Sequence, residues 1–153
     1  MLSIKEINRY TSNEFHEWQR ENLPKHFVMQ DIDTWALVWA DSAQNFEPFV
    51  IVELKRSFMN PESWKPFPQD KPNYISLKKL ADKSGLPLWI IYFKKGEVIK
   101  DKTIFRVFQI ESVSLQSHPW ITYTDILITA KDFREKFPYI FCQSNVGNVK
   151  GKG

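Results

Sequence analysis

The sequence contains little cysteine, histidine and glycine, and each shortage excludes a common kind of site. Its single cysteine, Cys142, cannot form an internal disulfide and, without a signal peptide at the start, predicts a reducing, cytoplasmic setting. Three scattered histidines and that one cysteine form no zinc-type cluster. With five glycines and no GxxxxGK pattern, the chain also has no phosphate-binding loop of the P-loop kind.

Long hydrophobic runs are absent as well. The longest, PFVIV and LPLWIIYF, are too short to span a bilayer, so we expect no membrane insertion. The 153 residues are 42% hydrophobic and include six Trp and twelve Phe, which predicts one folded domain with a substantial core. The net charge of +3 and a pI near 8.9 permit a polyanionic partner but are too weak to require one.

Two apolar runs within residues 30–55 each carry acid at one end. Asp31 and Asp33 precede TWALVWA, and Glu53 and Lys55 follow PFVIV, while DSAQNFEP between the runs has the composition of a hairpin connection. Because side chains two apart in a strand share a face, Glu53 and Lys55 point the same way. If the two runs pair antiparallel, Asp33 lies at the same end of the hairpin as Glu53 and Lys55.

Carboxylates beside apolar segments are costly to desolvate unless a positive charge shares the site. Mg²⁺ commonly binds through one or two carboxylates and keeps several waters, so the pattern predicts a Mg²⁺ or Mn²⁺ site. The main acid at the first strand is either Asp31 or Asp33. The competing interpretation is an ordinary ion pair between Glu53 and Lys55 on an exposed face, contributing about 1 kcal/mol or less.

The remaining pattern predicts a mixed α/β protein. Thr11 and Glu14 match a capping box for a helix over residues 11–22, which also carries Glu17. Asn73 is the expected N-cap of a lysine-bearing helix that stops at Gly85. The predicted elements that follow are strands over 86–94, 103–115 and 121–128, a closing helix over 129–137 capped by Thr129, and a frayed tail over 144–153.

The segment between residues 58 and 73 is rich in proline and aromatics and too long for a tight turn. In one interpretation Trp64 and Phe67 pack back onto the core. In the other the segment binds nucleic acid, its rings stacking on bases and its lysines contacting phosphates. The residues expected to contact nucleic acid are Arg56, Trp64, Lys65, Lys71, Lys78 and Lys79.

An acid pair, a nearby lysine and a hard metal are suited to phosphodiester hydrolysis by a metal-activated water. Asp33, then Glu53-Leu54-Lys55 at the end of an apolar run, then a lysine-bearing helix and the strand LPLWIIYF, resemble the PD-(D/E)xK nuclease superfamily. That superfamily includes restriction endonucleases and archaeal Holliday-junction resolvases. The resemblance covers roughly residues 11–93. Ile32 stands where the motif often has proline, and the first strand of the meander is not separately visible.

The resemblance implies a restriction-endonuclease-like core of helix, three-strand meander, helix and strand over about residues 11–94, with a C-terminal extension over about 103–141. It assigns Asp33, Glu53 and the Leu54 carbonyl as metal ligands and Lys55 as the catalytic lysine. A Glu of the first helix, Glu17 or Glu14, would join the site, and Glu17 is preferred because Glu14 already has a capping role.

These assignments predict a metal-dependent nuclease whose most favoured substrate is DNA. Two-strand cleavage usually needs two copies, so a homodimer stays open. The alternative is a non-catalytic module that keeps the nuclease fold and binds nucleic acid or a protein partner, as an inhibitor or assembly factor would. Such a module predicts salt-sensitive binding without dependence on a divalent metal.

Overall fold

The computed structural model describes residues 14–15, 17–25 and 32–142. The chain divides into two compact units, residues 1–31 and residues 32–153. In the first unit, residues 14–15 and 17–22 are helical, within the helix predicted over residues 11–22. The first strand of the expected meander, sought just before Asp33, falls on residues 26–31, which lie outside the described residues.

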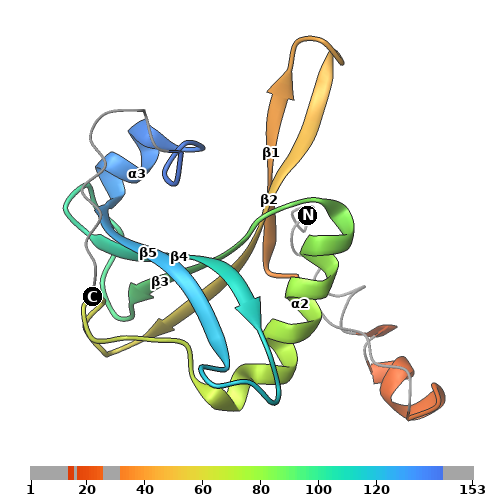
Figure 1. Cartoon of the computed structure of the whole chain (residues 1–153). Helices are drawn as coiled ribbons and strands as arrows, with labels where there is room; N and C mark the ends of the chain where they lie inside the picture. Colours follow the sequence, from red (N-terminus) through yellow and green to blue (C-terminus); the bar gives the residue numbers. More distant parts are fainter. Residues whose placement is uncertain (1–13, 16, 26–31, 143–153) are drawn as a thin grey trace. The chain divides into compact units, whose positions relative to one another are not determined.

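The second unit is an α/β fold with five described strands in one mixed sheet, ordered β1-β2-β3-β4-β5 (Figure 1). Strands β2 and β3 are parallel, and the other neighbouring pairs are antiparallel. The elements, in chain order, are β1 (Thr34–Ala40), β2 (Asn45–Ser57), the 3-10 turn η1 (Pro68–Asp70), α2 (Lys71–Ser84), β3 (Leu88–Lys94), β4 (Ile104–Val113), β5 (Ile121–Thr129) and α3 (Ala130–Lys136).

The predicted antiparallel hairpin of β1 and β2 is confirmed. Thr34 pairs with Val52, and the pairing continues to Ala40 opposite Asn45, with one irregularity between Ala36 and Leu37. β2 pairs with β3 only from Ile51 onward. Among the described residues, the first half of β2 therefore has only β1 as a strand neighbour, and Figure 1 shows the tip of this hairpin extending past the other strands.

Helix α2 forms the crossover between the parallel strands β2 and β3, as the strand, helix, strand pattern predicts. Its C-cap is Gly85, which adopts φ 68°, a left-handed conformation that glycine reaches without a Cβ clash. The prediction that Asn73 is the N-cap was wrong. The helix begins at Lys71 because Pro72 is well accommodated in a first helical turn, and Asn73 therefore lies inside that turn.

Apolar side chains fill both faces of the sheet. On one face Tyr74, Leu77 and Ala81 of α2 pack against the sheet and Trp64. On the other face the buried residues include Trp89 and Val107, with aromatic rings from α3 and the segment after it packed against them. Thr129 caps α3 as predicted, accepting a hydrogen bond from the Asp132 N–H at 3.1 Å. No helix in the described part of the chain has the length and apolar character to cross a membrane.

Candidate active site

The acids predicted from the hairpin meet on one face of the sheet. Asp33 lies immediately before β1, and because Thr34 pairs with Val52, the register continues to place Asp33 opposite Glu53. Residues directly opposite each other in an antiparallel pair share a face of the sheet. That face is the one covered by α2, since Ile51, two residues before Glu53, belongs to the core cluster beneath the helix.

Asp33 is fixed to the backbone of β2. Its Oδ2 accepts a hydrogen bond from the Leu54 N–H at 2.9 Å. The neighbouring odd-numbered residues direct their polar backbone groups to β3, as the Ile51 N–H and the Ser57 carbonyl show. In a strand the N–H and C=O of one residue point to the same edge. The Leu54 carbonyl therefore faces the β1 edge, the edge on which Asp33 lies.

Glu53 and Lys55 form a close ion pair on this face. The Lys55 Nζ lies 3.1 Å from Glu53 Oε1 and 3.7 Å from Asp70 Oδ2. Glu53 is only 6% exposed, whereas a quarter of the Lys55 side chain is exposed. The pair expected under the competing interpretation does exist, but its acid is buried, so it is not an exposed surface pair.

The first turn of α2 completes the surroundings of Glu53. Asn73 Nδ2 donates a hydrogen bond to Glu53 Oε1 at 2.8 Å, and the Lys55 Nζ lies 5.6 Å from the centre of the Tyr74 ring. The Tyr74 hydroxyl is buried and has no hydrogen-bond partner among the described residues. Burial raises the pKa of Tyr74, and the carboxylates of Asp70 and Glu53 raise it further. Tyr74 is therefore neutral at physiological pH.

Burial also raises the pKa of Glu53, and the negative charge of Asp33 adds to that increase. Hydrogen bonds from Lys55 and Asn73 and the charge of Lys55 act in the opposite direction, because they favour the carboxylate. The increase prevails, so the protein's own cations do not fully offset the cost of two neighbouring carboxylates, one of them buried. A further positive charge beside Glu53 would therefore favour its ionised form.

The candidate metal donors near Glu53 are oxygen atoms. Within the described ranges no three or more His, Cys, Asp and Glu side chains are grouped so as to hold a metal, and the nearby donors are the carboxylates of Asp33, Glu53 and Asp70 and the Leu54 carbonyl. Oxygen donors from one or two carboxylates, with waters completing the shell, are the usual environment of Mg²⁺ in proteins. Asp33, Glu53 and the Leu54 carbonyl, the ligands expected from the sequence, are oxygen donors of this kind.

Trp64 was assigned above to nucleic-acid contact, and this assignment was wrong. Its indole is 2% exposed and stacks on Tyr92 with ring centres 4.5 Å apart, so neither face is available to a base. Arg106 holds this loop in place: its Nη1 donates to the carbonyls of Glu62 and Trp64, each at 2.9 Å. The same guanidinium pairs with Asp125 at 2.8 Å. Of the two interpretations of the loop, core packing describes Trp64.

The cationic residues expected to contact nucleic acid are dispersed. Arg56 is exposed but follows Lys55 in β2, so it lies on the opposite face of the sheet. Lys71 lies 5.5 Å over the Trp120 ring, and Lys78 pairs with Asp82 at 2.8 Å. Lys65 and Lys79 are exposed. Lys71, at the start of α2, directly follows Asp70 in the sequence.

Three further acids were candidates for the site in the sequence. Glu14 and Glu17 are exposed helical residues of the unit formed by residues 1–31, and the choice between them stays a prediction. Asp31, the alternative to Asp33, lies outside the described residues. Among the described acids, Asp33 is the one that faces Glu53.

Sequence reasoning missed the contribution of the first turn of α2. Asp70, Asn73 and Tyr74 surround Lys55 and Glu53, but the pattern had suggested only a cap role for Asn73. The available signal was Pro72, which favours the first turn of a helix and so moves the helix start ahead of Asn73. No protein-family model, curated protein or solved structure matches this chain.

Proposed function

We propose that the protein is a Mg²⁺-dependent nuclease that hydrolyses phosphodiester bonds in DNA. The observation that carries the proposal is the convergence of Asp33, Glu53 and Lys55 on one face of the sheet, although twenty residues of sequence separate the two acids. The carboxylates supply hard oxygen donors, and the ammonium group beside them supplies the positive charge that a phosphoryl-transfer site needs.

Asp33, Glu53 and the Leu54 carbonyl would hold the metal ion. When bound there, the ion would supply Lewis acidity, which polarises a phosphoryl oxygen and lowers the pKa of a coordinated water. The Leu54 N–H keeps the Asp33 carboxylate in place, and Asn73 does the same for Glu53. Both acids are thereby oriented before substrate binds, which reduces the reorganisation required during reaction.

Lys55 is the candidate catalytic lysine. Its ammonium group is shared between Glu53 and Asp70, so it lies beside the donor set rather than pointing into solvent. From there it would orient the attacking water or offset charge on the phosphorane-like transition state. The buried, neutral Tyr74 ring below it limits solvent access on that side, which strengthens electrostatic interactions at the site.

The order of elements supports a restriction-endonuclease-like core as the finer description of the fold. The Asp-bearing strand β1, the strand β2 with Glu53 and Lys55, the crossover helix α2 and the parallel strand β3 follow one another as in the resemblance described above. Strands β4 and β5 with α3 would then be the C-terminal extension. The exposed Lys65 and Lys79 and the half-buried Lys71 are the candidate phosphate contacts.

The test is incubation of purified protein with supercoiled, linear, single-stranded and branched DNA, with Mg²⁺, with Mn²⁺ and with EDTA. We expect metal-dependent cleavage that is lost in Asp33→Asn and in Lys55→Ala. Matched controls are Asp41→Asn, at the hairpin turn, and Lys100→Ala, in the turn after β3; both should cleave like the wild type. Cleavage retained by a folded Asp33→Asn protein would refute the assignment.

Calorimetric titration with Mg²⁺ and Mn²⁺ separates this proposal from a non-catalytic module. The nuclease is expected to bind the metal, with the heat signal lost in Asp33→Asn and unchanged in Asp41→Asn. DNA binding that is sensitive to salt, with neither metal binding nor cleavage, would favour the module instead.

A further inference from the structure

The face of the β1–β2 hairpin bears a continuous apolar stripe that the proposed nuclease activity does not use. Exposure alternates along β1: Trp35, Leu37 and Trp39 are exposed, while the residues between them are half-buried. Trp39 and Phe46 meet across the hairpin with ring centres 5.3 Å apart. The three aromatic rings of the stripe are each about half exposed, with Trp35 at 56%, Trp39 at 48% and Phe46 at 56%.

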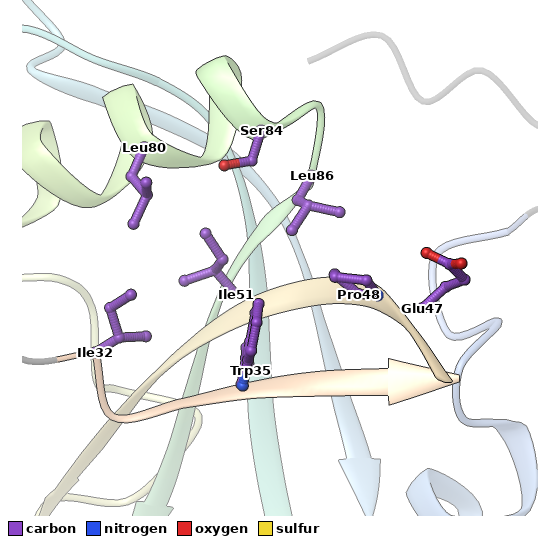
Figure 2. Close-up of a pocket in the computed structure, with 8 residues that line it drawn as sticks. All are labelled: Ile32, Trp35, Glu47, Pro48, Ile51, Leu80, Ser84 and Leu86. Atoms are coloured by element: carbon purple, nitrogen blue, oxygen red, sulfur yellow. The ribbon is translucent and has the colours of Figure 1, made fainter. Parts of the chain in front are cut away.

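The stripe leads into a groove between the hairpin and α2, with a volume of about 430 Å³. Leu80 and Ser84 of α2 and Leu86 after it form one wall, and Trp35 and Ile32 lie across from them (Figure 2). Ile51 and Pro48 of β2 form the floor. Glu47 lies at the end of the groove away from Ile32, toward the hairpin turn, and is the one charged residue among the described residues that line the groove.

The charge on this surface has one sign at the hairpin end. Residues 34–52 contain two acids, Asp41 and Glu47, and no Lys, Arg or His, although the chain has 21 Lys and Arg in all. A polyanion would be repelled by this end of the hairpin, so these rings are poorly placed to stack on bases. On the α2 side the exposed Lys79 and Lys83 carry positive charge. The two sides of the groove therefore differ in the sign of their charge.

The exposed apolar area of the stripe and groove is large enough to bind a peptide but smaller than the area that a stable dimer buries. Half-exposed aromatic side chains of this size present about 100 Å² each, so the three rings contribute roughly 300 Å², with smaller additions from Leu37 and Leu80. A stable protein dimer buries about 800 Å² per partner. Antiparallel pairing of two β1 strands centred on Leu37 would also set Asp33 of one copy opposite Asp41 of the other.

From these observations we infer that the groove and stripe bind a segment of a partner protein with large apolar side chains and a lysine or arginine beside them. The apolar side chains fill the groove between Trp35 and Leu80, and the basic residue lies at the Glu47 end. The inference does not depend on the nuclease proposal, because none of its residues is assigned to hold the metal or to act in hydrolysis.

The probe is a library of random peptides displayed on phage, selected against the full-length protein. We expect enrichment of peptides that pair a large apolar residue with Lys or Arg, and a loss of about tenfold or more in affinity for Trp35→Ser. Because Trp35 is more than half exposed, this variant should stay folded, which circular dichroism will check. A second selection against Glu47→Lys should enrich acidic instead of basic residues in the peptides, whereas Glu97→Lys, in the turn after β3, should leave the preference unchanged.

Several outcomes would overturn the inference. Selected peptides that bind Trp35→Ser as tightly as the wild type would place their site elsewhere, as would a basic preference that survives Glu47→Lys. Sedimentation that shows a dimer lost in Trp35→Ser would assign the surface to a second copy of the chain. An oligonucleotide that binds the wild type but not Trp35→Ser would assign it to nucleic acid. Failure to enrich any peptide would count against a peptide-binding surface.

Discussion

Replacing Glu53 by Gln is expected to stabilise the metal-free protein near neutral pH while removing the proposed activity. Glutamine has nearly the same shape, and its Oε1 can still accept the hydrogen bond from Asn73. The substitution removes a buried negative charge that is repelled by Asp33. Lys55 is not left without a partner, because Asp70 lies 3.7 Å from its ammonium group and part of the side chain is exposed.

The size of the effect follows from two opposing contributions. Removing a buried charge relieves a desolvation penalty of several kcal/mol, roughly 3 to 4 for a carboxylate at the edge of the core. Losing the charged hydrogen bond between Lys55 and Glu53 costs about 2 kcal/mol. The net change is an increase of about 1 to 2 kcal/mol in the free energy of unfolding, and each kcal/mol raises Tm by about 2 to 4 °C in a domain of this size.

The pH dependence gives the sharper test. The pKa of Glu53 is raised in the folded state above its ordinary value of 4.5. The contribution of Glu53 to stability is therefore fully present below pH 4.5 and is lost as the pH rises through the raised pKa. Wild type and Glu53→Gln should therefore unfold at similar temperatures below pH 4.5 and diverge toward neutral pH, with the variant more stable. Thermal unfolding followed by circular dichroism in EDTA, over a series of buffers, measures the difference.

Two controls complete the experiment. Glu62→Gln, at an exposed position in the loop before η1, should show no comparable divergence with pH. Added Mg²⁺ should raise the Tm of the wild type more than that of Glu53→Gln, because the variant lacks one of the proposed ligands. A Glu53→Gln protein less stable than the wild type at neutral pH would refute the reasoning, since the ion pair with Lys55 would then outweigh the cost of burial.

Three further predictions concern other parts of the molecule. Arg106→Met should lower the free energy of unfolding by about 3 kcal/mol, because three loop carbonyls and Asp125 lose their donor. Urea denaturation measures this change. As a control, Arg134→Met breaks the exposed pair with Asp101 and should lower the free energy of unfolding by less than about 1 kcal/mol. Gly85→Ala should cost about 1 kcal/mol, because the C-cap has φ 68°, and an unchanged Tm would contradict it. In Asn73→Ala, cleavage should be lost at a higher pH on the acid side of the pH profile, because a hydrogen bond that favours ionised Glu53 is lost. A profile identical to that of the wild type would limit Asn73 to a structural role.

The elements with strong local signals could be predicted from the sequence. The two apolar runs around the DSAQNFEP turn form the expected hairpin, and Gly85 ends α2 where it was expected. Thr129 likewise caps α3. These features depend on period, turn composition and capping chemistry within a few neighbouring residues. The placement of Asp33 opposite Glu53 does not follow from the hairpin length alone. The register at the turn would set Asp33 opposite Val52, and the irregularity between Ala36 and Leu37 shifts it by one residue to the face of Glu53.

The surroundings of those residues depended on tertiary structure. The sequence left open whether Trp64 faces solvent or the core. Trp64 is buried because it stacks on Tyr92 and because Arg106 binds its carbonyl, and both residues are distant along the chain. In the same way, Asn73 reaches Glu53 only because the crossover of α2 returns its first turn to that face of the sheet. The sequence by itself determined which acids and which lysine share a strand end, since strand periodicity and turn composition are local. Burial of Glu53, and with it the raised pKa, was decided by long-range packing, because desolvation depends on every element that covers the group.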